Sequence, residues 1–476
     1  MAVLEAWLRA AERILWGPGT LALLLGTGAF LTVRLDFLPW RNLGWALRSV
    51  LSREARRGGE EGVSPFSALM TALAATIGTG NIVGVATALT AGGPGALVWM
   101  EISALLGMST KFAECTLAVK YRRRDRQGQP YGGPMYVMAT ALGRPGAVLG
   151  AVFALFAVGA SFGIGSMTQA NSIVEALSAS FSLPPLAVGA VTAGLALVII
   201  LGGIQGISRV SSVLVPAMAL LYLGAGLAVI LGNWRNLPQA VGDILLCALS
   251  PRAAAGGAAG TAAASFFNTL RWGVARGVFS NEAGLGSAAI SAASARTDSP
   301  ARQGYISMTG IVFDTLVLCT VTGLAICASG VLDGAEAQGA DGAALTILAF
   351  QSVLGQTGGA LVSICVTLFA FTTIIGWAYQ GEMAFGYLTG GRWLRAYRSA
   401  FALAALWGAV VKLETVFRLA DICNALMALP NLLCLLLLSG VAAAEARTFQ
   451  VRLQGAPPSS LRGIPLSRKR KNTAKS

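Results

Sequence analysis

Ala72-Leu-Ala-Ala-Thr-Ile-Gly-Thr-Gly-Asn-Ile-Val-Gly-Val-Ala-Thr-Ala88 is an apolar segment that Gly78-Thr79-Gly80-Asn81 interrupts in its middle. Neither half alone reaches across a bilayer, which takes about 20 helical residues. The two halves together predict one membrane-spanning helix with an unwound centre, where the glycines loosen the helix and free backbone groups. Free N–H and C=O groups are costly in hydrocarbon unless a partner pairs with them, so we expect a small ligand or an ion at the interruption.

A second interrupted segment, Gly277-Val-Phe-Ser-Asn-Glu-Ala-Gly-Leu-Gly-Ser-Ala-Ala-Ile290, repeats this pattern. Gly284-Leu285-Gly286-Ser287 is again G-x-G followed by a small helix-capping residue. Two interrupted helices in corresponding places indicate internal repeats around a binding site. Close helix packing through glycine is the alternative, because it gives the same motif without a site. Polar residues at the two breaks favour the binding site: Asn81, Ser280, Asn281 and Glu282.

The composition predicts a polytopic α-helical membrane protein. Of 476 residues, 55% are hydrophobic and 12% are charged, and the mean hydropathy is +0.67. The net charge of +14 lies mainly in loops and in the C-terminal tail, so membrane topology explains it and no nucleic-acid partner is predicted. The chain has no histidine, and its 7 cysteines form no C-x-x-C motif. This excludes histidine-dependent catalytic triads and histidine-containing zinc sites, and we predict neither an enzyme nor an organic cofactor.

The apolar runs predict an all-α fold with about 11 membrane-spanning helices, one N-terminal helix followed by two sets of five. Residues 1–445 are expected to form a single transmembrane transporter domain, and residues 446–476 a basic, disordered tail. Arg209 is expected in a short turn, residues 233–261 in a loop, and Lys111 paired with Glu114. The expected spans are residues 16–33, 65–91, 96–119, 145–177, 185–201, 213–231, 262–293, 305–328, 358–385, 397–411 and 415–444.

Charged loops predict the orientation in the plasma (inner) membrane. The loops after Val33, Val119, Ala293 and Phe385 are rich in lysine and arginine and fall on one side, as does the tail. The acidic loop of residues 331–342 falls on the other side. By the positive-inside rule, the C-terminus is cytoplasmic and the N-terminus lies outside.

Three motifs resemble a known family, the alanine or glycine:cation symporters (sodium:alanine symporters). They are residues 71–95 (TALAATIGTGNIVGVATALTAGGPG), 277–287 (GVFSNEAGLGS) and 371–377 (FTTIIGW). The resemblance covers about residues 15–445. It implies a LeuT-like fold in which a five-plus-five inverted repeat contains two broken helices. It also implies import of a small neutral amino acid, alanine or glycine, coupled to sodium entry by alternating access.

The two breaks carry opposite partial charges and therefore match the two ends of an α-amino acid. The second half of the first helix is expected to begin near Asn81, and its positive N-terminus favours a carboxylate at the backbone of Thr79, Gly80 and Asn81. The first part of the other broken helix is expected to end near Phe279. The carbonyls of Phe279, Ser280 and Glu282 would receive the ammonium group. The resemblance further implies that Gln169 and Trp377 form walls of the pocket.

The expected sodium site combines hydroxyls with carbonyls, since sodium prefers oxygen ligands. The resemblance implies Thr372 and Thr373 as hydroxyl ligands and Ala74 and Ile77 as carbonyl ligands. The alternative is that each threonine bonds the carbonyl of its own preceding turn.

Two carboxylates stand out because an acidic residue inside a membrane is costly and marks function by default. Glu282 lies at the second break, and its alternative role is an ion pair with Arg276. Asp314 could pair with an arginine or coordinate a cation. Both could also carry protons, so proton coupling remains the alternative to sodium. A channel and a membrane-embedded enzyme are less favoured, since a binding site predicts saturable uptake and the chain shows no catalytic cluster.

Overall fold

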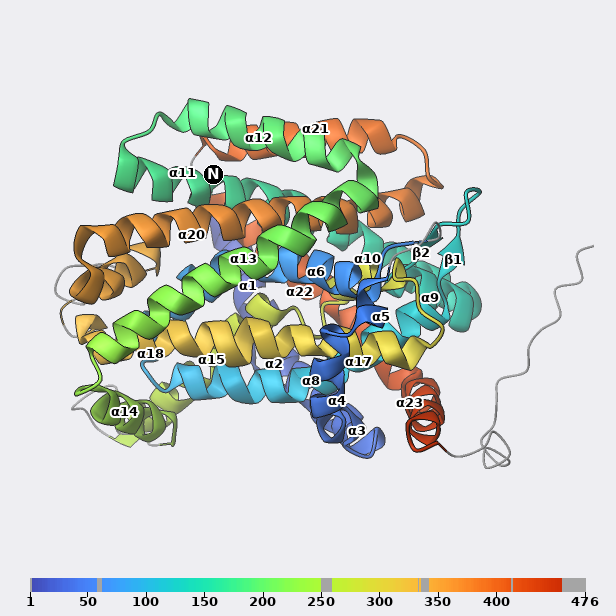
Figure 1. Cartoon of the computed structure of the whole chain (residues 1–476), viewed down its shortest axis with the longest axis horizontal. Helices are drawn as coiled ribbons and strands as arrows, with labels where there is room; N and C mark the ends of the chain where they lie inside the picture. The colour runs from blue at the N-terminus through green and yellow to red at the C-terminus, as the bar shows by residue number, and fades with distance from the viewer. Residues whose placement is uncertain are drawn as a thin grey trace, which may run out of the picture.

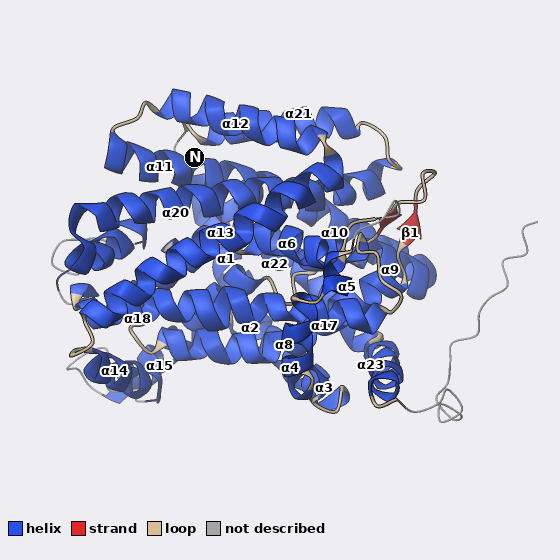
Figure 2. Ribbon diagram, in the orientation of Figure 1, coloured by secondary structure: helices blue, strands red, loops and turns tan. Residues whose placement is uncertain are grey.

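The computed structural model describes residues 2–57, 62–249, 259–332, 334, 342–411 and 414–455. These residues form a bundle of helices, accompanied by one short antiparallel hairpin, β1 (Arg123–Arg124) with β2 (Pro130–Tyr131) (Figure 2). Most of the long helices run in one general direction (Figure 1). The hairpin and α9 (Pro134–Ala141) lie at one end of the bundle and α14 (Leu237–Leu249) at the other.

Seven helical stretches of the described residues are long and apolar enough to cross a membrane. They are Glu5–Arg34, Ala96–Lys120, Gly143–Phe181, Gly203–Gly232, Pro300–Ser329, Gly342–Thr389 and Thr415–Leu437. Shorter apolar helices include both halves of the first interrupted segment. The predicted class, an all-α polytopic membrane protein, is therefore confirmed.

The first interrupted segment is a broken helix, as predicted. Helix α6 (Pro65–Thr76) ends before Gly78, residues Thr79–Asn81 form a single 3-10 turn (η1), and α7 (Val83–Gly92) follows. The second half therefore begins two residues later than expected, because the 3-10 turn takes up the residues around Asn81.

The second interrupted segment is also broken. Helix α15 (Ala259–Asn281) continues two residues beyond the expected end at Phe279, and α16 (Ser287–Ala293) begins after a short turn. Three residues of this turn have positive φ: Glu282 (54°), Gly284 (94°) and Gly286 (82°). Glycine is the residue that adopts this conformation at least cost, which explains the G-x-G motif here.

The remaining helices surround the two broken ones. Two of the long helices contain π-helical segments, η2 and η3. The elements are α1 (Ala2–Leu15), α2 (Pro18–Arg34), α3 (Leu38–Arg41), α4 (Leu43–Val50), α5 (Arg53–Arg56), α8 (Ala96–Lys120), α10 (Gly143–Phe162), η2 (Gly163–Met167), α11 (Thr168–Phe181), α12 (Pro185–Leu201), α13 (Gly203–Gly232), α17 (Pro300–Ile311), η3 (Val312–Cys319), α18 (Thr320–Ser329), α20 (Gly342–Thr389), α21 (Leu394–Gly408), α22 (Glu414–Leu437) and α23 (Ser439–Leu453).

Several local expectations were wrong. Arg209 lies within α13 and not in a turn, because the connection from α12 is the single residue Gly202. Residues 233–261 are not all loop, since the apolar run LPQAVGDILLCAL folds as α14. Helix α23 continues to Leu453, beyond the domain boundary expected at residue 445. The loop around Ala253, most of the acidic loop 331–342 and residues 456–476 lie outside the described residues.

The start of α6 and the end of α16 are joined through their backbones. Val63 and Ala295 form an isolated parallel bridge, in which Val63 N donates to Ser294 O at 3.2 Å and Arg296 N donates to Val63 O at 2.8 Å. The two broken helices are thus connected at the end of the bundle that carries the β1–β2 hairpin.

Candidate functional site

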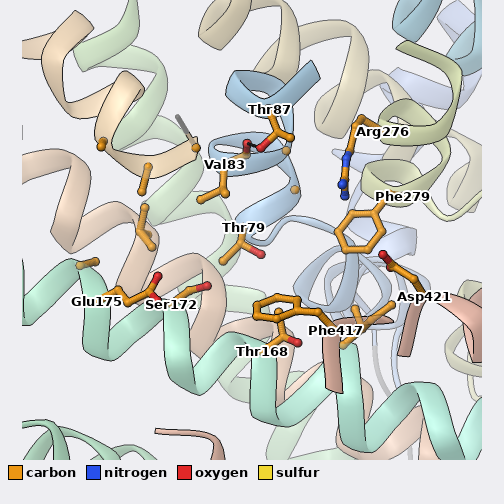
Figure 3. Close-up of a pocket in the computed structure, with 18 of the residues that line it drawn as sticks. Thr79, Val83, Thr87, Thr168, Ser172, Glu175, Arg276, Phe279, Phe417 and Asp421 are labelled. Atoms are coloured by element: carbon orange, nitrogen blue, oxygen red, sulfur yellow. Dashed lines mark hydrogen bonds between the residues drawn. The ribbon is translucent and has the colours of Figure 1, made fainter. Parts of the chain in front are cut away.

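A cavity of about 630 Å³ reaches the first break from one end of the bundle. Helices α7, α11, α15, α20 and α22 contribute to its walls, and Thr79 and Gly80 also line it. Figure 3 shows the Thr79 side chain in this cavity. Of the substrate residues predicted from the sequence, Thr79, Gly80 and Phe279 line this cavity. Six others are buried behind it: Asn81, Gln169, Ser280, Asn281, Glu282 and Trp377.

Two backbone donors at the first break have no acceptor among the described residues. Gly78 N donates to Asn81 Oδ1 at 3.0 Å, and Asn81 N donates to Gly78 O at 3.3 Å. Within the described part of the chain, the N–H groups of Thr79 and Gly80 have no hydrogen-bond partner. Because buried backbone donors are nearly always paired, these two N–H groups mark a place where an anionic ligand group would bind.

At the second break, two backbone carbonyls lack a hydrogen-bond donor among the described residues. At the end of α15, Ala283 N donates to Asn281 Oδ1 at 3.0 Å and Gly284 N donates to Glu114 Oε1 at 3.0 Å, so neither continues the helical pattern. The carbonyls of Phe279 and Ser280 therefore receive no hydrogen bond from the described residues. Glu282 O differs from the expectation, because Leu285 N already donates to it at 3.3 Å.

The two breaks are in direct contact. A Cβ atom placed on Gly80 would lie 3.4 Å from Ser280 Cα and 3.5 Å from the Phe279 ring. The unpaired N–H groups and the unpaired carbonyls consequently lie on facing segments. This arrangement provides donors and acceptors close together, which is what an α-amino acid with its carboxylate and ammonium requires.

Asp314 connects both breaks to η3. Its carboxylate accepts hydrogen bonds from Asn81 Nδ2 (2.7 Å), Ser280 Oγ (2.9 Å) and Thr315 Oγ1 (2.8 Å). Thr322 Oγ1 donates to Asn81 O at 2.9 Å. Of the two roles expected for Asp314, pairing with an arginine is wrong within the described residues, since all three donors are neutral.

Glu282 is held by neighbours other than Arg276. Its carboxylate accepts a hydrogen bond from Trp377 Nε1 at 3.0 Å and another from Ser287 Oγ. The Arg276 guanidinium instead lies over the rings of Trp272 and Phe279, at 5.3 and 5.5 Å from their centroids. The alternative ion pair between Glu282 and Arg276 is therefore absent from the described structure.

Among the described residues, Lys111 and Glu114 do not form the expected direct ion pair. Lys111 Nζ donates to Asn281 O at 2.7 Å, where a cation complements the negative end of α15. Glu114 accepts from Gly284 N and from Asn431 Nδ2, the latter at 2.6 Å. The spacing in sequence puts these two side chains on one face of α8. In the structure each of them instead bonds a backbone group of the second break, Lys111 the carbonyl of Asn281 and Glu114 the N–H of Gly284.

The four residues proposed as sodium ligands are arranged unequally. Thr373 Oγ1 lies 3.5 Å from Ile77 O and 3.0 Å from Phe369 O, so it faces both the first break and its own preceding turn. Thr372 Oγ1 is directed at Phe369 O (2.9 Å) and Met218 Sδ (3.5 Å). Ala74 is fully buried on the last turns of α6.

Gly78 permits the close approach of Thr373. A Cβ atom on Gly78 would lie 2.4 Å from Thr373 Oγ1, so any other residue would push the hydroxyl away from the break. Gln169 supports the same region, since Thr79 Oγ1 donates to its Oε1 at 3.3 Å and its Nε2 donates to Ile164 O at 3.0 Å.

This network also contains three residues that were not predicted from the sequence, Thr315, Thr322 and Asn431. A signal for the first two exists, because polar residues recur on the otherwise apolar stretch that contains Asp314. Asn431 lies on α22, far along the chain, and no local pattern marks it.

Two interrupted helices that meet at the inner end of a cavity, within a bundle of apolar helices, define a membrane transporter of the broken-helix class. The solved structure of MhsT in complex with L-phenylalanine has this fold, with a TM-score of 0.56 and 16% identity over 82% of this chain and 90% of that one. The sodium:alanine symporter family model matches residues 1–459, and the chain belongs to that family.

Two curated relatives illustrate the family. The sodium/alanine symporter AgcS of Methanococcus maripaludis is 47% identical over 436 residues, which are 91% of this chain and 94% of that protein. A Bacillus subtilis protein named "Probable sodium/glutamine symporter GlnT" is 37% identical over 441 residues, 92% of this chain and 89% of that protein. The protein is therefore a multi-pass membrane protein that transports an amino acid together with sodium, and it is not an enzyme.

Proposed function

We propose that this symporter imports alanine or glycine with sodium by alternating access. The observation that carries the proposal is a set of four backbone groups that have no partner among the described residues, the N–H groups of Thr79 and Gly80 and the carbonyls of Phe279 and Ser280. They belong to two segments in contact, and three of the four residues, Thr79, Gly80 and Phe279, line the cavity. AgcS, the relative named as a sodium/alanine symporter, supports the choice of substrate.

In the proposed complex, the substrate carboxylate accepts hydrogen bonds from Thr79 and Gly80. The N–H of Asn81 is already bonded to Gly78 O, so Asn81 acts through its side chain, which positions the break. The ammonium group donates to the carbonyls of Phe279 and Ser280. Asn281 and Glu282 hold the second break in shape, and Gln169 and Trp377 close the pocket from behind.

The proposed sodium site lies at the end of α6. Thr373 and Ile77 form its centre, with Ala74 and Thr372 as the further ligands. Their oxygens are neutral hydroxyls and carbonyls, a set that suits a hard monovalent cation. In this scheme sodium binding stabilises the first break, and the ordered break then binds the amino acid.

The proposed membrane arrangement has 11 crossings. Helix α2 is the first, and two oppositely oriented sets of five follow, each beginning with a broken helix. The arginines of the β1–β2 hairpin support a cytoplasmic location for that end of the bundle and for the C-terminus, with the N-terminus outside. The cavity then opens to the outside. The crossings are α2, α6–α7, α8, α10–α11, α12, α13, α15–α16, α17–α18, α20, α21 and α22.

Uptake of labelled alanine into proteoliposomes tests the proposal. We expect an inward sodium gradient at equal pH to drive saturable uptake, and a proton gradient without sodium to leave the rate at background. Unlabelled glycine should compete strongly and glutamine weakly. Uptake driven by a proton gradient without sodium would show that the transporter is coupled to protons. Strong competition by glutamine would show that the substrate is not limited to alanine and glycine. Flux that does not saturate would indicate a channel.

A further inference from the structure

Helix α11 presents a carboxylate to the cavity that leads to the breaks. Thr168, Ser172 and Glu175 lie one helical turn apart and all face the cavity (Figure 3). Glu175 is exposed there, and within the described part of the chain it has no hydrogen bond and no ion pair. Ionisable residues of membrane-spanning helices that face a cavity commonly mark the path of an ion or a substrate, so the position of Glu175 calls for a function.

The other charges of the cavity lie away from Glu175 and largely compensate one another. Arg418 forms an ion pair with Glu12, with 3.2 Å between Nη1 and Oε2. Arg276 and Asp421 lie on the same side of the cavity as each other, near Phe279 and Phe417 (Figure 3). The lining thus holds three carboxylates and two guanidinium groups, and Glu175 supplies the uncompensated negative charge.

Glu175 lies on the side of the cavity that leads to the proposed sodium site, and not beside the backbone groups that receive the amino acid. Ala176, Ala344 and Val366 belong to the lining on the α11 and α20 side, where the other side chains are mostly apolar. Val366 is on α20, the helix that carries Thr373 seven residues later, about 10 Å along the axis. A cation that enters the cavity along α20 consequently passes Glu175 before it reaches the first break.

We propose that Glu175 is an entry residue that concentrates sodium in the cavity and repels amino acids with anionic side chains. A single uncompensated charge in a confined, solvent-filled cavity raises the local concentration of ions of opposite sign, and this effect is screened by salt. The inference rests on the proposed sodium-coupled uptake and adds a residue outside the site formed by the breaks. Glu175 coordinates sodium only transiently, so its removal weakens sodium dependence without abolishing transport.

The test compares sodium dependence at two ionic strengths in proteoliposomes that contain the full-length chain. At about 20 mM total salt, Glu175→Gln should raise the half-saturating sodium concentration about threefold or more, and at about 500 mM choline chloride the variant and the wild type should converge. Glu175→Asp, which keeps the charge, should behave like the wild type. Glutamate should inhibit alanine uptake by Glu175→Gln more than uptake by the wild type.

The matched control is Asp243→Asn, an exposed carboxylate on α14 that does not line the cavity. It should leave sodium dependence unchanged at both ionic strengths. The inference is overturned if Glu175→Gln has the wild-type half-saturating sodium concentration at low salt. It is also overturned if the increase in that concentration is as large at high salt as at low salt, because this indicates a structural effect. Wild-type uptake that ignores sodium would instead refute the proposed function, and this inference with it.

Discussion

Asn81 Nδ2 and Asp314 Oδ1 are 2.7 Å apart, although 233 positions separate the two residues in the chain. The bond joins the first helix break to η3, and Ser280 brings the second break to the same carboxylate. The two breaks are therefore positioned by one buried side chain. A change at Asn81 is expected to affect both halves of the site.

Asn81→Ala should reduce both stability and alanine binding. The substitution removes the acceptor for Gly78 N and one donor to Asp314, and each buried group left unpaired costs about 1–3 kcal/mol. We expect a lower melting temperature of the purified protein and a smaller rise on addition of alanine. Asn171→Ala on α11 is the control and should change neither, because the Asn171 side chain has no hydrogen bond among the described residues and does not line the cavity. A wild-type melting temperature and a wild-type rise with alanine in Asn81→Ala would show that the first break does not depend on this side chain.

Thr373→Ala should raise the half-saturating sodium concentration of uptake more than Thr372→Ala does. Of these two threonines, Thr373 has the hydroxyl that reaches a carbonyl of the first break, whereas Thr372 faces its own helix and Met218. Loss of one oxygen ligand worth about 1.4 kcal/mol corresponds to about a tenfold change. Thr373→Ser retains the hydroxyl and should stay close to the wild type. If all three variants have the wild-type half-saturating sodium concentration, the cation binds elsewhere.

Gly80→Val should abolish alanine binding in a protein that still inserts. A Cβ on Gly80 meets Ser280 and Phe279 at ordinary contact distance, so Gly80→Ala should fold and bind alanine somewhat more weakly. The additional methyl groups of valine would separate the two breaks. Alanine-induced stabilisation measures this, and Gly194→Val, which has open space around its Cβ, is the control. A stable Gly80→Val protein with full alanine-induced stabilisation would remove the first break from the substrate site.

Cysteine labelling should reveal the orientation. A membrane-impermeant thiol reagent is expected to label Gly334→Cys, but not Gln127→Cys, in intact cells. Both positions are exposed, and Gln127 lies next to the β1–β2 hairpin. Permeabilised cells should label both variants, which controls for accessibility. The reverse pattern in intact cells would invert the proposed topology and place the cavity on the cytoplasmic side.

Local sequence patterns were enough to predict the class of fold and both helix breaks. Both breaks could be located because a G-x-G motif interrupts an apolar segment. The positive φ of Gly284 and Gly286 is a local backbone cause, whereas Gly78 is required by the close approach of Thr373. Boundaries were less accurate where polar or charged residues occur in helices. Arg209 and residues 237–249 were assigned to a turn and a loop, although they are helical, in α13 and α14.

Partners of buried charges could not be predicted in the same way. Glu282 was weighed against Arg276, and Lys111 against Glu114, because both pairs are close in sequence. In the folded chain, Trp377 and Asn431 reach the carboxylates from helices more than 90 positions away. Such partners depend on how helices pack, which no local spacing encodes.

The parallel bridge between Val63 and Ala295 is made entirely by main-chain atoms. Alanine scanning would therefore pass over it, because every truncated side chain still leaves the N–H and C=O groups in place. Proline at position 296 would remove the donor to Val63 O. Because the side chains do not take part, both positions can change in sequence without loss of the bridge. Covariation between positions 63 and 295 would therefore be weak, even for a bridge that has to break when that end of the transporter opens.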